Sequence, residues 1–331
     1  MSNNIIIANA GAVVNVINVE NALTKQKSRD KWQEKKTHAF IVADKLKSAK
    51  KFKRSERMRM CGQYIVAQEC KVCGHMHIKA AKLCRDRLCP ICTWRLSMRR
   101  FASMYTIVEG LRWAYPESSW YFCTLTCQNC RPQDLKQTLD EMLRAWNGIT
   151  STKKFKAIYD GWARSLEITY NKETKTVHPH FHVLLMSTAH GELDYIIKRW
   201  MKTCEIHTTW SAQDIKQIKS LENSTPEDEM PVDAILETYK YSIKSSDIED
   251  MPLSVFKATD EAIQGRRLVA FGGMIKEYAR NCEIKQLDEA SAEDEAEAEA
   301  QIKKCTHCGS KAVAEIVGEW SGSGYIWRTE G

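Results

Sequence analysis

Three of the nine histidines lie at alternate positions in the segment His178-Pro-His-Phe-His182, directly before the apolar run Val183-Leu-Leu-Met186. Aliphatic and β-branched residues favour strands, so this pattern predicts a buried strand over residues 177–186. Side chains on a strand alternate between its two faces, which places all three imidazoles on one face. Imidazoles at this spacing are typical of a divalent-metal site. The alternative, hydrogen-bonded core histidines, is the weaker interpretation because three lie on one face of one strand.

An acidic residue on a neighbouring strand is expected to complete this site. Residues 163–170 alternate in polarity, and the polar segment Asn171–Thr176 that follows is rich in turn formers. We therefore predict an antiparallel hairpin in which Glu167 lies across from the histidines. A carboxylate with two or three imidazoles, from His178, His180 and His182, suits Mg²⁺ or Mn²⁺ at least as well as zinc. In the alternative interpretation, Glu167 is solvated on an exposed strand face.

A helix with a reactive face is predicted over residues 231–244, where apolar residues recur at three- and four-residue spacing after Pro231. Glu237, Tyr241 and Lys244 then share one face, whereas Tyr239 joins the apolar stripe. A phenol can attack a phosphodiester when a nearby cation stabilises the phenolate, and a carboxylate beside it can activate water. On helical spacing alone, a residue such as Tyr241 is more often an ordinary surface residue of an amphipathic helix.

Cysteine pairs in residues 61–92 indicate a structural zinc site. Cys70-x2-Cys73 and Cys89-x2-Cys92 are separated by 15 residues, the spacing of a zinc ribbon or knuckle. A second zinc, or a mixed set that uses His75 or His77, is left open. Arginines crowd the same region, and they suit contacts to a DNA backbone or packing on the rest of the chain. They are Arg85, Arg87, Arg95, Arg99 and Arg100.

The charge distribution is compatible with a nucleic-acid partner. The chain has 49 basic and 42 acidic residues, but the acidic ones concentrate in residues 227–229 and 288–299. The basic run Lys45–Arg59 therefore belongs to a distinctly cationic body, as phosphate-backbone binding requires. No apolar run reaches the about 20 residues of a membrane-spanning helix. Thirteen cysteines without an export signal favour reduced thiols, metal ligation and a cytoplasmic location.

Cys305-x2-Cys308 near the end of the sequence is only half of a zinc site. Cys282 or the cysteines of another subunit are its candidate partners, and we assign no metal to it. Residues 321–327 resemble a short hairpin.

Together these segments resemble the replication initiators of small rolling-circle plasmids, within the HUH endonuclease superfamily. The family's histidine motif is matched by His180-Phe-His182, and its Glu-x3-Tyr-x2-Lys motif by Glu237, Tyr241 and Lys244. A Phe-x-Thr-Leu-Thr strand is matched by Phe122–Thr126. The similarity also includes the segments Arg87–Arg95 and Gly265–Gly273, and runs in the family's order from about residue 61 to residue 277. The family pattern of zinc ligands stresses Cys84 with Cys89 and Cys92, so Cys84 and Cys61 are alternative ligands.

The resemblance implies an α+β fold. We expect a central antiparallel sheet with flanking helices on one face, of the HUH or palm-like kind, with the histidine strand central, the tyrosine helix beside it and an N-terminal Cys-rich zinc module. The expected parts are a basic, partly disordered segment (1–60), the zinc module and a helix (61–115), the catalytic domain (116–287), and an acidic linker with a small Cys-containing hairpin (288–331).

The resemblance also implies an activity. Tyr241 would nick one strand at the plasmid's double-strand origin, stay joined to the 5′ phosphate and leave a 3′ hydroxyl for extension. Mg²⁺ or Mn²⁺ on His180, His182 and Glu167 would polarise the phosphate, and Glu237 would activate water at termination. The implied partners are plasmid origin DNA (double-stranded, then single-stranded after extrusion), host helicase, single-strand binding protein and DNA polymerase, with no membrane and with a homodimer left open.

Two other functions fit the same residues. One is an HUH-type transposase or relaxase, against which the motif spacing and the small size argue. The other is a zinc-ribbon DNA-binding regulator without chemistry, in which the histidines are structural.

Overall fold

The computed structural model describes most of the chain, in two compact units. The described residues are 28–189, 194–204, 209–218, 232–239, 243–284, 304–305 and 308–329. The larger unit comprises residues 34–63 and 82–297, and the smaller unit comprises residues 1–33, 64–81 and 298–331. This division differs from the predicted module of residues 61–115, because residues 64–81 group with the end of the sequence. Each unit is described by itself below.

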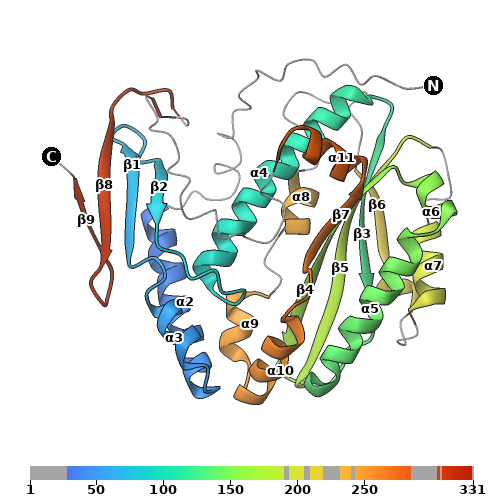
Figure 1. The fold of residues 1–331 in the computed structure, drawn as a ribbon, viewed down its shortest axis with the longest axis horizontal. Helices are drawn as coiled ribbons and strands as arrows, with labels where there is room; N and C mark the ends of the chain where they lie inside the picture. Colours follow the sequence, from blue (N-terminus) through green and yellow to red (C-terminus); the bar gives the residue numbers. More distant parts are fainter. Residues whose placement is uncertain are drawn as a thin grey trace. The chain divides into compact units, whose positions relative to one another are not determined.

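The larger unit is built on a five-stranded antiparallel sheet in the order β6-β3-β5-β4-β7 (Figure 1). Its strands are β3 (Ser119–Thr126), β4 (Gly161–Asn171), β5 (Thr176–Ser187), β6 (Asp214–Ile218) and β7 (Val269–Gly273). The histidine strand β5 is central, between β3 and β4. Its apolar run Val183–Met186 is fully buried, as the sequence predicts.

Helices cover both faces of this sheet, so the expectation of helices on one face is wrong. The helices α4 (Pro90–Ala114), α8 (Val232–Tyr239) and α11 (Met274–Asn281) lie on one side, and α5 (Leu135–Thr150), α6 (Lys153–Ile158) and α7 (Tyr195–Thr203) lie on the other (Figure 1). The cause is the central strand, which is apolar on both faces. Phe181 meets the rings of Trp146 in α5 and Trp200 in α7, with centroids 6.1 and 5.7 Å apart.

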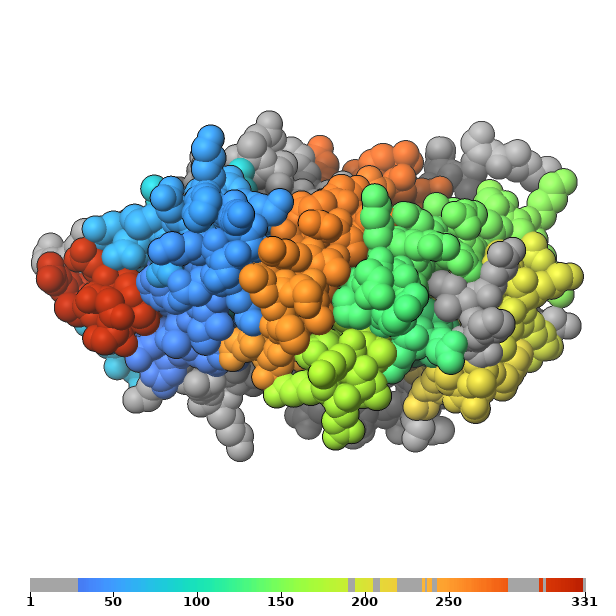
Figure 2. Space-filling view, turned by 90° about the horizontal axis from the view of Figure 1, so that it is seen from below, coloured from blue at the N-terminus to red at the C-terminus, as the bar shows by residue number. Residues whose placement is uncertain are grey.

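The remaining helices of the larger unit pack around this core. They are α9 (Ser245–Asp250), α10 (Leu253–Ile263), α3 (Phe52–Arg59) and most of α2 (Ser28–Ser48), with short 3₁₀ turns η1 (Pro132–Asp134) and η2 (Trp210–Ala212). In Figure 2 the orange surface of α10 adjoins the green surface of α5. Of the segment expected to be basic and partly disordered, residues 28–48 and 52–59 form helices, and Val42, Ala43 and Leu46 make a buried stripe that stabilises α2.

The smaller unit contains a four-stranded antiparallel sheet in the order β2-β1-β8-β9. Its strands are β1 (Tyr64–Cys70), β2 (Met76–Ala81), β8 (Val313–Trp320) and β9 (Tyr325–Thr329). The hairpin predicted near residues 321–327 is confirmed as β8–β9. It pairs with β1 from Tyr64↔Glu319 to Cys70↔Val313. A two-stranded hairpin is marginally stable alone, so the β1–β2 hairpin gains its core from the other end of the chain.

The structure is therefore of the α+β class, with antiparallel sheets and flanking helices, as predicted. The sequence reasoning did not foresee the pairing of β1 with β8, because strand partners more than 200 residues apart leave no local pattern.

Candidate metal centre and active site

The candidate metal centre is formed by the β4–β5 hairpin. Antiparallel pairing places Glu167 directly opposite His180, and Ser165 opposite His182. Alternation along β5 turns both imidazoles toward the face that α8 covers, while Phe181 turns toward α5 and α7. Sequence reasoning predicted this arrangement because both strands and their turn are local in the chain.

Three ligand atoms of this hairpin converge on one point. Nε2 of His180 lies 3.2 Å from Nε2 of His182, and Oε2 of Glu167 lies 3.4 and 3.0 Å from these two nitrogens. The point equidistant from the three atoms is about 1.9 Å from each, close to the about 2.0–2.1 Å of Mg²⁺–ligand or zinc–imidazole bonds. All three residues are buried, at 5–9% exposure. The donor set and its spacing therefore fit a divalent cation.

Charge at the centre favours an ionised carboxylate. Burial by itself raises the pKa of Glu167, but hydrogen bonds and charge from His180 and His182 outweigh it and hold that pKa well below its ordinary value. The pKa of His178 is lowered, first by burial and then by its neighbour His180. A carboxylate that stays ionised is the form that binds cations.

The structure does not bring the third histidine to this point. His178 is not among the grouped ligand atoms, and its Nε2 is hydrogen-bonded to the hydroxyl of Thr126 on β3. The expectation that His178 joins the cation is therefore not supported by its position. Its role here is a packing one, next to the ring of His180 with centroids 5.2 Å apart.

Residues of β3 orient the histidines, and sequence reasoning missed them. Register places Thr124 opposite His182 and Thr126 opposite His180. The Thr124 hydroxyl lies 3.5 Å from Nδ1 of His182, and the ring of Phe122 stacks on that imidazole at 5.4 Å. The signal was present in the alternating segment Phe122–Thr126, which the resemblance singled out without assigning it a role. A partner for the second ring nitrogen fixes the orientation of an imidazole ligand.

The predicted tyrosine helix does not continue through Lys244. The described part of it, α8, spans Val232–Tyr239, and Lys244 has the extended conformation of a residue that precedes the next helix, α9. Tyr241 lies outside the described residues. Glu237 and Lys244 nevertheless reach the centre: Oε1 of Glu237 is 3.8 Å from Nε2 of His182, and Nζ of Lys244 is 3.6 Å from Oε1 of Glu167.

Tyr239 is in the core, as predicted. It is 2% exposed, its hydroxyl has no hydrogen-bond partner among the described residues, and burial raises its pKa. A phenol in this state is a poor nucleophile, so the structure excludes Tyr239 from that role.

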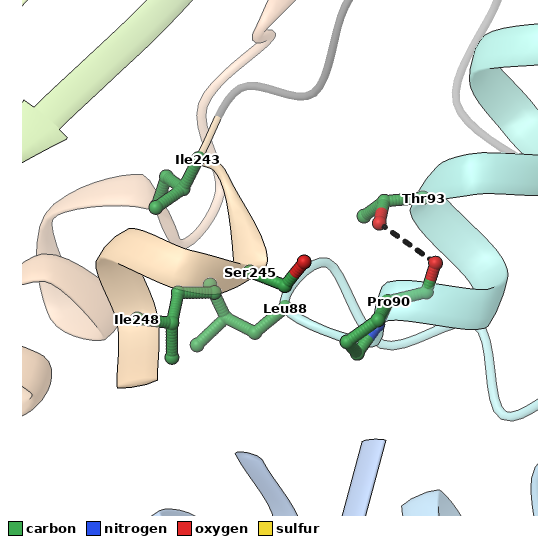
Figure 3. A pocket seen from close by; sticks show the side chains of 6 residues that line it. All are labelled: Leu88, Pro90, Thr93, Ile243, Ser245 and Ile248. Carbon is green, nitrogen blue, oxygen red and sulfur yellow. Dashed lines mark hydrogen bonds between the residues drawn. The ribbon is translucent and has the colours of Figure 1, made fainter. Parts of the chain in front are cut away.

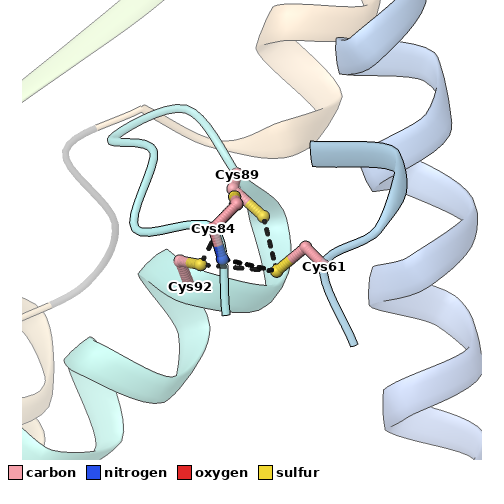
Figure 4. A group of neighbouring side chains, drawn as sticks. All are labelled: Cys61, Cys84, Cys89 and Cys92. Atoms are coloured by element: carbon pink, nitrogen blue, oxygen red, sulfur yellow. Dashed lines mark hydrogen bonds between the residues drawn. The ribbon is translucent and has the colours of Figure 1, made fainter. Parts of the chain in front are cut away.

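Four cysteines of the larger unit form one cluster: Cys61, Cys84, Cys89 and Cys92 (Figure 4). The sulfur of Cys92 lies 3.5 Å from that of Cys61 and 3.7 Å from that of Cys84, and the sulfurs of Cys61 and Cys89 are 3.6 Å apart. Sulfurs at the corners of a zinc tetrahedron are about 3.8 Å apart when each lies about 2.3 Å from the ion. The cluster therefore fits a structural zinc ion, and its members include both alternatives, Cys61 and Cys84.

Backbone groups and a buried lysine surround this cluster. The amides of Cys84 and Arg85 donate to the sulfurs of Cys61 and Cys92, at 3.4 and 3.2 Å. The ammonium group of Lys36 donates to the carbonyls of Arg59 and Cys61. Burial lowers the pKa of Lys36 to about 8, and the neighbouring cysteines oppose this shift. A cation beside four thiolates offsets their negative charge.

The predicted set of Cys70, Cys73, Cys89 and Cys92 is not brought together. Cys70 and Cys73 belong to the smaller unit and group with Cys305 and Cys308. Spacing along the sequence suggested one site because two Cys-x2-Cys pairs lie close together, but the strand pairing of β1 with β8 separates them.

The cysteine cluster of the larger unit is linked to the segment that follows Tyr241. Leu88, Pro90 and Thr93 line a small hollow together with Ile243, Ser245 and Ile248 (Figure 3). The chain on either side of Cys89 therefore packs against the start of α9. A zinc ion on this cluster would support the position of the start of α9.

Comparison with known proteins identifies the family. A family model described as a replication protein matches residues 75–325. The chain is 30% identical over 296 residues to a protein named Protein rep from Bacillus amyloliquefaciens, covering 80% of this chain and 86% of that protein. The chain belongs to the Rep family of plasmid replication initiators.

Other relatives agree with this assignment. A Protein rep from a Bacillus species is 31% identical over 266 residues, covering 73% of this chain and 83% of that protein. A Protein rep from Lactiplantibacillus plantarum is 26% identical over 302 residues, covering 87% and 92%. No solved structure matches the chain. This replication protein is therefore similar to its relatives over most of its length.

The arginines expected to bind DNA fall into two groups in this replication protein. Arg87 donates to the carbonyls of Ile263 and Arg266, and Arg100 is buried. Both therefore stabilise the fold rather than face a DNA strand. Arg85, Arg95 and Arg99 are half-buried, and the guanidinium of Arg95 lies 5.8 Å from the ring centre of Trp94.

The basic residues of the run 45–59 also fall into two groups, those bonded within the protein and those that are exposed. Arg54 forms ion pairs with Asp86 and Asp260, and Lys45 donates to the carbonyl of Met251. The other basic side chains of the run, apart from Arg59, are exposed: Lys47, Lys50, Lys51, Lys53 and Arg57. They lie at the end of α2, in the turn and along α3, so this helical hairpin presents the cationic surface that the sequence predicted.

Within the described part of the chain, no helix is long and apolar enough to cross a membrane.

Proposed function

We propose that this replication protein nicks one strand of plasmid origin DNA, with Tyr241 as the nucleophile and a divalent cation held by Glu167, His180 and His182. The observation that carries the proposal is the convergence of Glu237 and Lys244 on the same three ligands. A buried, pre-aligned Glu-His-His group with a carboxylate and an ammonium at its edge fits phosphodiester chemistry better than a purely structural role.

In the proposed reaction the Tyr241 oxygen attacks the scissile phosphorus and loses its proton to solvent. The new oxygen–phosphorus bond joins the enzyme to the 5′ phosphate. The bond between phosphorus and the 3′ oxygen breaks, and that oxygen takes a proton from solvent to become the 3′ hydroxyl. Mg²⁺ or Mn²⁺ bound to this group would supply Lewis-acid polarisation of the phosphate. Lys244, which is half exposed, supplies positive charge for the developing phenolate and phosphate.

Glu237 is the proposed base for the closing step. It lies at the edge of the centre and is partly exposed, where it can accept a proton from a water molecule. Hydrolysis would then end a round without a second covalent tyrosine. His180 and His182 lie on the central strand β5, and side chains of the neighbouring strand β3 contact His182, so the two histidines serve as fixed ligands.

The exposed cations of the α2–α3 hairpin are the proposed contacts to the DNA backbone. Lys47, Lys50, Lys51, Lys53 and Arg57 are exposed cations that can pair with phosphates, so they would contribute affinity that falls with salt. The 3′ hydroxyl left by the nick is a primer for a host DNA polymerase, with helicase and single-strand binding protein as further host partners.

A zinc ion on Cys61, Cys84, Cys89 and Cys92 is the proposed structural cofactor of the larger unit. Its role is to hold the loop before α4, which packs against the segment beyond Tyr241. This loop supports the active site without taking part in the reaction.

A nicking assay on supercoiled origin plasmid with Mn²⁺ tests the proposal. Wild-type protein should produce open circles that carry protein on the 5′ end. The substitution Tyr241→Phe should lower nicking by at least about a thousandfold, because phenylalanine has no hydroxyl with which to form the covalent bond. The matched control is Tyr239→Phe, which removes a buried hydroxyl only two residues away and should nick at the wild-type rate. Equal nicking and linkage by the Tyr241 variant would refute the nucleophile.

A further inference from the structure

The smaller unit contains two turns of the same sequence form, Cys-x-x-Cys-Gly. One runs from Cys70 to Gly74 at the end of β1, and the other from Cys305 to Gly309 before β8. In each, the glycine amide donates to the carbonyl of the first cysteine at 2.9 Å. The amide of each first cysteine donates five residues ahead, to His75 at 2.9 Å and to Ser310 at 2.7 Å. The two turns therefore share the same pair of backbone hydrogen bonds.

The glycines are required by this geometry. Gly74 has φ +71° and Gly309 has φ +73°, and a Cβ built on either would meet nothing within 4 Å. Glycine is therefore required by the left-handed backbone conformation at these positions and not by a lack of space for a side chain. Such turns direct the two cysteine sulfurs and the amides of the turn toward one point, as in the knuckles of structural zinc sites.

The two turns face each other. The sulfurs of Cys70 and Cys308 are 3.6 Å apart, and so are those of Cys73 and Cys305. The four sulfurs lie within 4.8 Å of one another. These separations are far longer than a disulfide bond and close to the about 3.8 Å expected between sulfurs that share a zinc ion.

We propose that Cys70, Cys73, Cys305 and Cys308 bind a second Zn²⁺, separate from the ion of the larger unit, and that this ion completes a zinc ribbon made from two distant parts of the chain. Cys73 and Cys305 are 232 positions apart. Each thiol releases its proton to solvent as its sulfur binds the ion, so no oxidant or reductant is needed.

The ion supplies stability that the sheet of the smaller unit lacks. Two short hairpins share one apolar face, where Ile65, Ala67, Ile316 and Trp320 are buried. A core of this size is too small for independent stability without a metal or a disulfide. The zinc ion fixes the β1 end of one hairpin to the β8 end of the other, at the position where the pair Cys70↔Val313 closes the ladder. The proposal does not depend on the nicking reaction.

The experiment measures metal and thiol protection in the full chain purified under reducing conditions. Elemental analysis should find two zinc ions per wild-type chain. The double variant Cys305→Ser/Cys308→Ser should retain one. The matched control Cys282→Ser removes an exposed cysteine outside both clusters and should retain two.

A second measurement needs no variant and therefore does not depend on whether a variant folds. Wild-type protein is alkylated before and after a zinc chelator is added, and each cysteine is followed by mass spectrometry. We expect Cys73 and Cys308, although exposed, to be protected relative to Cys282 until zinc is removed. One zinc ion per chain, with Cys73 and Cys308 alkylated as fast as Cys282, would overturn the proposal. So would iron in place of zinc.

Discussion

The β4–β5 centre and the two cysteine clusters are built on opposite principles. Glu167, His180 and His182 come from one hairpin, and the ladder fixes their register before any cation binds. The cysteines come from separate turns: Cys61 joins a loop more than 20 residues later, and Cys73 joins Cys305 across most of the chain. In the first case the fold makes the site, whereas in the second the ion helps to make the fold.

The two kinds of site differ in what remains when the metal is removed. Without a cation, the carboxylate of Glu167 still accepts hydrogen bonds from His182 and His180, so no buried charge is left unpaired. Four cysteine thiols make only weak hydrogen bonds with one another, so the clusters lose more of their stabilisation than the hairpin when the ion is removed. Removal of the metal should therefore abolish activity at the β4–β5 centre without unfolding it, whereas it should lower the stability of the cysteine clusters.

Loss of a zinc ligand in the larger unit is expected to have the largest effect. Cys89 is fully buried at the start of α4, next to the loop that packs on Ile243 and Ile248. Cys89→Ser should lower the free energy of unfolding of the larger unit by on the order of 5 kcal/mol, since structural zinc contributes about 10–16 kcal/mol in small zinc-dependent folds. Thermal unfolding monitored by circular dichroism checks this, with Cys282→Ser as the unaffected control. A folded variant with unchanged Tm would mean that this cluster is not held by metal.

Loss of a ligand in the hairpin should instead separate activity from stability. His182→Ala should lower nicking by about a hundredfold or more, because a cation ligand is removed from a charge-stabilising site. The strand keeps its pairing with β3 and β4, so Tm should change by no more than about 4 °C, the shift that corresponds to about 1 kcal/mol in a unit of this size. Nicking rate and Tm measured on the same preparation check both. A variant that unfolds like Cys89→Ser would erase the distinction between the two kinds of site.

The same contrast explains how much of the fold could be predicted from the sequence. Alternation predicted β3, β4 and β5, and the turn-rich segment Asn171–Thr176 predicted the hairpin, because these signals act between neighbours in the chain. The second helix layer was missed, although the continuous apolar run Val183–Met186 already required cover on both faces. The sheet of the smaller unit was missed because its central pairing joins β1 to β8.

The candidate sites follow the same rule. Glu167 with His180 and His182 was predicted from the hairpin pattern. The structure does not group His178 with them, because alternation gives the face of a side chain but not its hydrogen-bond partner, Thr126. The prediction combined two cysteine pairs because they lie close together in the sequence. It therefore grouped Cys70 and Cys73 with Cys89 and Cys92, whereas the structure groups them with Cys305 and Cys308. The extended conformation of Lys244 could not be foreseen, because the helical periodicity continues through residue 243.

A substitution of Glu237 tests whether this residue is one of the cation ligands or a separate general base. Its carboxylate lies 3.8 Å from His182, but it belongs to α8 rather than to the sheet. Glu237→Ala should therefore leave Mn²⁺ affinity within about twofold of wild type and nicking within about tenfold, while the hydrolytic closing step slows by about a hundredfold, the usual loss for a general base. Mn²⁺ titration and the yield of released circles check these values. Weakened Mn²⁺ binding would make Glu237 a ligand, and unchanged release would remove its role as a base.

The smallest effect is expected at a glycine of the ribbon. Gly309→Ala places a side chain on a backbone with φ +73°, which costs about 1–2 kcal/mol. Because the turn and the zinc site form together, this cost should appear as about 5–30-fold weaker binding of one of the two zinc ions. Competition with a chromophoric chelator measures it. Gly265→Ala is the matched control, since Gly265 has φ +68° with no neighbour within 4 Å, but it precedes β7 in the larger unit, outside both cysteine clusters. It should carry the same backbone strain and leave both zinc affinities unchanged. If both variants hold zinc as the wild type does, the Cys-x-x-Cys-Gly turn is a feature of the β-sheet alone, and the ribbon needs no ion.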